Sequence, residues 1–140
     1  MKTQKNPVTL LIVFSIWLGL ILGCKTSPQS EATNPITISA EDLYKAYQSN
    51  EAEADELYKG KMLIVTGTVG RAETRTREVT LVDALHRHIV LCAGFATDQE
   101  DTISKLKAGQ TVSVKGKCVG RAHVLGMSIE QVALQDCVVQ

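Results

Sequence analysis

The chain has 140 residues, with 15 basic and 15 acidic side chains, and it is 44% hydrophobic but only 4% aromatic. This length suits one compact domain and leaves too little chain for two full-sized domains. Proteins that grip nucleic-acid phosphates usually carry a clear basic excess, so the balanced charge argues against that class.

The first predicted element is an export signal at residues 1–23. Lys2 and Lys5 precede an apolar run over residues 8–22, which is shorter than the roughly 20 residues that span a membrane. The run ends at Ile21-Leu22-Gly23-Cys24, which resembles the lipobox of bacterial lipoproteins, whose cysteine receives diacylglycerol and becomes the mature N-terminus. We therefore expect lipidation at Cys24; an ordinary signal peptide or an uncleaved anchor is the alternative.

Residues 24–35 are predicted to be a flexible tether. They are polar, include two prolines and lack an apolar period, so they offer no face to bury. Lys25 rather than Asp follows the expected lipid site, which argues against retention in an inner membrane. We expect an extracytoplasmic protein that is anchored to a bacterial membrane, and to the outer membrane where the source has one.

Two short helices are predicted at the start of the domain, which spans residues 36–140. Ser39 is placed to cap the first helix, which turns Leu43 and Tyr47 inward. Asn50 is placed to cap the second helix, which runs towards a stop at Gly60.

From Lys61 onward the pattern changes to strands. We expect strands at residues 62–69, 77–83, 88–92, 111–119 and 127–139, with Gly67 as a bend or bulge in the first. A helix over residues 98–107, capped by Thr97 or Asp98, lies between the third and fourth strands. This order predicts an OB-fold, a five-stranded Greek-key barrel, in an all-β to α+β chain with an N-terminal helical extension.

Five segments carry a family resemblance. They are residues 47–61 (YQSNEAEADELYKGK), residues 65–69 (VTGTV), Cys92 with Phe95, residues 109–118 (GQTVSVKGKC) and residues 134–137 (LQDC). Together they resemble the tRNA_anti-like (tRNA-anticodon-domain-like) OB-fold family of bacterial exported proteins, over about residues 40–139. The resemblance implies an OB barrel, and many members look like lipoproteins. It implies no established activity, and the family name records a fold similarity. Ala93-Gly94 departs from the family's tighter spacing between Cys92 and Phe95.

Basic side chains gather beside the predicted second strand. Arg71, Arg75, Arg77 and His88 are the candidates for a ligand face, because strands two and three and their loops bind ligands in OB-folds. His86 and Arg87 lie close to them in the sequence. An anion, an oligosaccharide or a single-stranded nucleic acid would suit such a face. The scarcity of aromatic side chains and the exported location argue against nucleic acid. An ordinary solvated loop is the alternative.

Three cysteines follow Cys24, and an oxidising compartment favours one disulfide among them, with one thiol left over. Three pairings are open, and positions near strand ends favour Cys118–Cys137 over those that include Cys92. His86, His88 and Cys92 share an even spacing that places them on one side of a continuous strand. No fourth zinc ligand is obvious, and a thiol–histidine pair so close along one strand is rarely oriented for catalysis. We therefore predict no metal, cofactor or catalytic residue.

The predicted function is a lipid-anchored, non-catalytic binding or structural module of the cell envelope. Its expected partners are the membrane, through Cys24, and an envelope protein or a polyanionic ligand. Two alternatives stay open: binding of nucleic acid, oligosaccharide or another anion through the face of strands two and three, and a metal- or thiol-active protein.

Replacement of the expected lipid site tests the anchor. Cys24→Ala removes the thiol that would accept the lipid, so we expect the protein to leave the membrane fraction and to lose lipid labelling. Fractionation with radiolabelled fatty acid measures both. Unchanged labelling of the variant would refute lipidation at Cys24.

Overall fold

The computed structural model describes residues 34–124 and 127–140, and it describes side chains outside residues 123–129. The predicted signal peptide, Cys24 and most of the tether lie outside the described residues. Within the described part of the chain, no helix is both long and apolar enough to cross a membrane.

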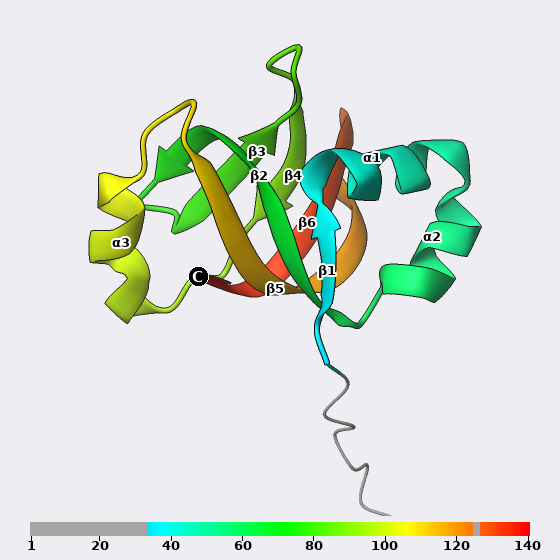
Figure 1. Cartoon of the computed structure of the whole chain (residues 1–140), viewed down its shortest axis with the longest axis horizontal. Coiled ribbons are helices and arrows are strands. Elements are labelled where there is room, and N and C mark those ends of the chain that lie inside the picture. Colours follow the sequence, from blue (N-terminus) through cyan, green and yellow to red (C-terminus); the bar gives the residue numbers. More distant parts are fainter. Residues whose placement is uncertain (1–33, 125–126) are drawn as a thin grey trace, which may run out of the picture. The chain divides into compact units, whose positions relative to one another are not determined.

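Five strands close into a barrel, which confirms the predicted OB-fold (Figure 1). They are β2 (Met62–Glu73), β3 (Glu78–Val82), β4 (His88–Cys92), β5 (Thr111–Val124) and β6 (Met127–Val139). Neighbours follow the order β2-β3-β4-β6-β5, and β5 pairs back with β2 to close the ring. The β4–β6 pair is parallel and the other four pairs of the ring are antiparallel.

The remaining elements lie outside the ring. They are β1 (Ile36–Ser39), α1 (Ala40–Ser49), α2 (Glu51–Tyr58), the 3₁₀ turn η1 (Thr97–Gln99) and α3 (Glu100–Lys105). β1 pairs in parallel with β2, and the sequence analysis did not anticipate this short strand. Both predicted caps of the N-terminal helices are confirmed. The Ser39 hydroxyl accepts from the Asp42 amide at 3.0 Å, and the Asn50 side chain accepts from the Glu53 amide at 3.3 Å.

The irregularity of β2 falls at Gly70, so the expectation of a bulge at Gly67 is wrong. The β2–β5 ladder runs unbroken through Gly67, whereas the β2–β3 ladder shifts register between Val69 and Arg71. Gly67 serves another purpose, because a Cβ there would lie 2.8 Å from the Ala40 Cβ. Its missing side chain lets the start of α1 approach the barrel closely.

The helix between β4 and β5 is shorter than predicted. A 3₁₀ turn takes up its first residues, and neither Thr97 nor Asp98 makes a side-chain capping bond. α3 ends before Leu106, which has an extended backbone. Ile103 of α3 points into the core, since only 1% of that residue is exposed.

One hydrophobic core joins the barrel to its helices. Leu43 and Tyr47 of α1 and Ile103 of α3 belong to the same buried cluster as the inward residues of the strands. In Figure 1, α1 and α2 lie to the right of the barrel and α3 to the left. The barrel strands therefore keep one apolar face inward and leave the other face for polar side chains.

A pair of leucine substitutions tests this burial. Leu43 is 0% exposed and Leu85 is 74% exposed. We expect Leu43→Ala to lower the free energy of unfolding by about 2–5 kcal/mol, because it leaves a cavity in the core. Leu85→Ala should change it by no more than about 0.5 kcal/mol. Urea unfolding measures both values, and equal effects would contradict the burial of α1.

Candidate functional site

A polar groove lies along the β2–β3 hairpin, of which β3 is the predicted second strand, and it contains Arg71 and Arg75 of the predicted ligand face. It has a volume of about 290 Å³ and is lined by Arg71, Glu73, Arg75, Thr76, Glu78 and Thr80. Arg71 pairs with Thr80, and Glu73 with Glu78, across the two strands. The register shift beside Arg71 bends this part of β2. We call these six residues the hairpin groove.

The charges of the hairpin groove are only partly paired. Arg71 Nη2 lies 2.8 Å from Glu73 Oε2, and this contact holds the pKa of the Glu73 carboxyl below its ordinary value. Among the described residues, neither Arg75 nor Arg77 forms an ion pair. The groove therefore offers guanidinium donors to an incoming anion.

His88, on β4, does not line the groove but contacts Thr80, which does. Its Nδ1 lies 2.9 Å from the Thr80 hydroxyl, which faces the Arg71 carbonyl oxygen at 3.5 Å. Gly70 makes room for the imidazole, because a Cβ there would lie 3.2 Å from His88 Cε1. Arg71, Thr80 and His88 therefore form a row across three neighbouring strands.

Arg77 occupies the turn of the same hairpin but does not line the groove. Its φ is 53°, a left-handed conformation, and its amide donates to the Thr74 carbonyl at 3.2 Å. The structure thus brings Arg71, Arg75 and His88 to one face and places Arg77 at the tip of that hairpin.

Arg87 belongs to a different surface from the predicted ligand face. Its Nε donates to Asp83 Oδ2 at 2.7 Å, and its guanidinium carbon lies 6.0 Å from the centre of the Tyr44 ring. Burial acts to raise the pKa of Asp83, but hydrogen bonds from Arg87 and from the backbone outweigh it and lower that pKa. Arg87 lines a second groove, of about 300 Å³, beside α1. The sequence did not reveal this grouping, because α1 and the β3–β4 turn are far apart in the chain.

The structure does not place His88 and Cys92 on one side of a strand, as their even spacing had suggested. His88 is exposed, whereas Cys92 is 0% exposed in the core. Ile89 and Val90 are both buried, because the β3–β4 ladder shifts register there and interrupts the alternation. The described residues hold no group of three or more potential metal ligands from His, Cys, Asp and Glu.

The three described cysteines are free and buried thiols, so the Cys118–Cys137 bond is not formed in this structure and stays a prediction. Cys118 Sγ lies 3.5 Å from the Tyr47 hydroxyl. Burial raises the pKa of Cys118, despite a hydrogen bond with Tyr47 that lowers it. The Cys118 thiol is therefore a poor nucleophile at neutral pH.

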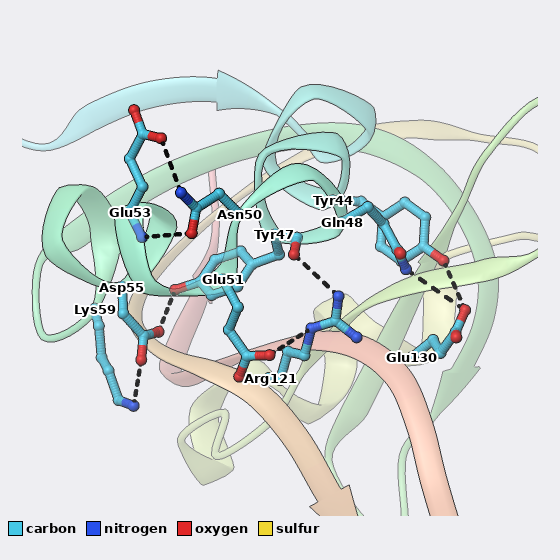
Figure 2. Close-up of polar contacts among 10 residues, drawn as sticks. All are labelled: Tyr44, Tyr47, Gln48, Asn50, Glu51, Glu53, Asp55, Lys59, Arg121 and Glu130. Carbon is cyan, nitrogen blue, oxygen red and sulfur yellow. Dashed lines mark hydrogen bonds and ion pairs between the residues drawn. The ribbon is translucent and has the colours of Figure 1, made fainter.

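Residues of the family segment 47–61 form, together with Arg121, a polar network that fastens α1 and α2 to the barrel (Figure 2). The Tyr47 hydroxyl donates to Asp55 at 3.0 Å, and Asp55 pairs with Lys59 at 2.8 Å. From β5, Arg121 Nη2 donates to the Tyr47 carbonyl at 3.0 Å, and its Nε lies 3.2 Å from Glu51. Arg121 could not be placed in this network from the sequence, because no local pattern links β5 to the helices. These contacts give Tyr47, Glu51, Asp55 and Lys59 a structural role that requires no ligand.

Removal of one hydroxyl tests the network. The contacts with Lys59 and Tyr47 lower the pKa of Asp55 in the folded protein. The ionised Asp55 carboxylate therefore stabilises the fold above the pKa that Asp has in the unfolded chain, about 3.9. This stabilisation is lost as the pH falls through the pKa of Asp55 in the folded protein. We expect Tyr47→Phe to cost about 1 kcal/mol at pH 7 and less at pH 3. Urea unfolding at both values measures the difference.

Tyr58→Phe is the matched control, since no hydrogen bond of the Tyr58 hydroxyl occurs among the described residues. We expect it to leave the stability nearly unchanged at either pH. A pH-independent loss in Tyr47→Phe would contradict the role of the Asp55 carboxylate.

Known proteins support the fold. The chain is similar to a solved structure from Klebsiella pneumoniae subsp. pneumoniae that is described provisionally as a nucleic acid-binding lipoprotein. The two chains are 19% identical, with a TM-score of 0.51 over 76% of this chain and 92% of that one. No match is found among curated proteins. The model of the tRNA_anti-like family matches residues 1–138. The chain therefore belongs to the tRNA_anti-like family.

Proposed function

We propose that the protein is a lipid-anchored binding module of a bacterial cell envelope, and that its hairpin groove binds an anionic oligosaccharide. One observation carries the proposal: Arg71 and Arg75 line an open polar groove of about 290 Å³ on the β2–β3 hairpin. β2 and β3 are the first two strands of the barrel, and the loop between them belongs, with the face of the second and third barrel strands, to the usual OB-fold surface for oligosaccharides and oligonucleotides.

The chemistry of the groove suits a sugar that carries a carboxylate or a phosphate. A guanidinium group donates two parallel hydrogen bonds to such an anion. Arg75 has no carboxylate partner among the described residues, so an anion would meet it without breaking an ion pair. Thr76, Thr80 and Glu78 offer hydroxyl and carboxylate groups that exchange hydrogen bonds with sugar hydroxyls.

Single-stranded nucleic acid is the second candidate, because the similar Klebsiella structure is described provisionally as a nucleic acid-binding lipoprotein. Aromatic side chains normally stack on the bases and contribute about 1–3 kcal/mol per base. Tyr47 and Phe95 are each 1% exposed, and no aromatic residue lines the hairpin groove. The oligosaccharide is therefore the favoured ligand.

Lipid attachment at Cys24 is part of the proposal. Its support is the lipobox-like run Ile21-Leu22-Gly23-Cys24 and the likeness to a chain described as a lipoprotein. Residues 24–35 would then hold the domain near a membrane surface, within reach of envelope glycans. We infer binding rather than catalysis, because the buried Cys92 thiol and the exposed His88 ring do not form a dyad.

Calorimetric titration of the detergent-purified full chain tests the ligand. The probes are a uronate oligosaccharide, a neutral oligosaccharide of equal length and a single-stranded DNA oligonucleotide. We expect the uronate to bind most tightly, and added salt to weaken its binding. Arg71→Ala with Arg75→Ala should reduce this affinity by at least about tenfold, because hydrogen bonds to charged groups contribute about 1.5–3 kcal/mol each.

The control variant removes two positive charges from a surface outside the hairpin groove. Lys115→Ala with Lys117→Ala changes β5, outside the hairpin groove, and should leave the affinity within about twofold at moderate salt. Equal binding of the neutral and anionic sugars, or equal losses in the two double variants, would contradict the proposal. Tightest binding of the oligonucleotide would establish the second candidate instead.

A further inference from the structure

We propose that Cys92 and Cys137 form the disulfide of the exported protein and that Cys118 stays a thiol. The proposal rests on the export that is part of the proposed function. It differs from the Cys118–Cys137 pairing that the sequence favoured, and it follows from how β4, β5 and β6 meet in the core.

The parallel pairing of β4 with β6 brings the ends of these strands together. Cys92 stands opposite Leu134 in the register, and the next amide, of Ala93, donates to the Leu134 carbonyl at 3.0 Å. Farther along, a Cβ on Gly94 would lie 3.1 Å from the Asp136 amide nitrogen. The chain that leaves β4 therefore runs against residues 134–136, directly before Cys137.

A local irregularity in β6 turns Cys137 inward. Gln135 and Asp136 are both exposed, Asp136 has a φ of 53°, and the β5–β6 ladder shifts register opposite them. Cys137 then returns to the core, where it is 1% exposed. Its sulfur fills the space above Gly116, since a Cβ at Gly116 would lie 2.8 Å from Cys137 Sγ.

Cys92 and Cys137 belong to the same buried core cluster. A hydrogen bond with Cys137 and then burial raise the pKa of Cys92. Cys118 has a different partner, because its sulfur contacts the Tyr47 hydroxyl at 3.5 Å. The fold thus brings Cys92 and Cys137 together, whereas Cys118 contacts the network that fastens α1 and α2 to the barrel.

The oxidation proceeds by thiol–disulfide exchange while the chain folds, before the core excludes the reagent. The thiolate of one cysteine attacks an external disulfide, such as that of an envelope oxidoreductase or of oxidised glutathione, and releases one thiol. The second thiolate then attacks the mixed disulfide and releases the other thiol. The protein loses two electrons and two protons in all, and the external disulfide becomes two thiols.

Peptide mapping of the unreduced protein tests the pairing. The full chain is expressed with its own signal, trapped with acid, denatured and labelled with a maleimide, and its tryptic peptides are analysed by mass spectrometry. We expect the label on Cys118 alone and a linked pair of peptides containing Cys92 and Cys137. Label on Cys92 alone, or on all three cysteines, would overturn the proposal. Label on Cys24 would report a failure of lipidation separately, because the thioether does not react.

Thermal unfolding with and without reductant supplies an independent readout. We expect reductant to lower the melting temperature of the wild type and of Cys118→Ala, because a cross-link stabilises the fold by restricting the unfolded chain. The double variant Cys92→Ala with Cys137→Ala should show no such shift. To separate poor export from poor pairing, the purified full chain is refolded in oxidised glutathione and mapped again. Failure of the linked pair to form there would also overturn the proposal.

Discussion

The closure of the barrel on β2 is the constraint on which the rest of the structure depends. β2 pairs with β5 over Met62–Thr68 and with β3 from Thr68 onward, while β1 lies along its first half. One strand thus joins the two edges of the sheet, which removes the open edges of the ring. Because the β2–β3 register shifts at Gly70, the second half of β2 turns Arg71 outward into the hairpin groove.

The same closure places the basic side chains near β3 on two outer surfaces. The β2–β3 hairpin carries Arg71 and Arg75, and the β3–β4 turn carries Arg87, which Asp83 and the Tyr44 ring hold beside α1. Sequence proximity had suggested one basic cluster, but the strands separate it. The groove that remains is small and mixed in charge, which is why we assign it a sugar with a few anionic groups rather than a long polyanion.

Several residues of the family segment 47–61 are explained by the way the N-terminal helices attach to the barrel. Tyr47 reaches Asp55 with its hydroxyl and Arg121 with its carbonyl, and its ring is buried in the core. Gly120 fits the same contact, because a Cβ there would lie 2.9 Å from Asp55 Oδ1. These residues stabilise the fold, so they say little about the ligand. The polar β2–β3 hairpin is the better place to look for specificity.

Features that depend on neighbouring residues could be predicted from the sequence alone. The Ser39 and Asn50 caps act over three positions, and apolar alternation with turn residues located the five strands and the intervening helix. These signals are local, so the OB-fold and its helical extension could be predicted. The likeness to the tRNA_anti-like family rested on such segments as well, and the family model confirms it.

Which distant residues meet could be established only from the folded barrel. The register shift at Ile89 sends His88 outward and Cys92 inward, although their spacing is even. The parallel β4–β6 pair and the turn at Asp136 bring Cys137 rather than Cys118 towards Cys92. Ladder register and barrel closure involve segments far apart in the chain, and no short window of sequence contains both partners. For that reason the fold and the hairpin could be predicted from the sequence. The residues that line the groove and the partners of the thiols could be identified only in the folded barrel.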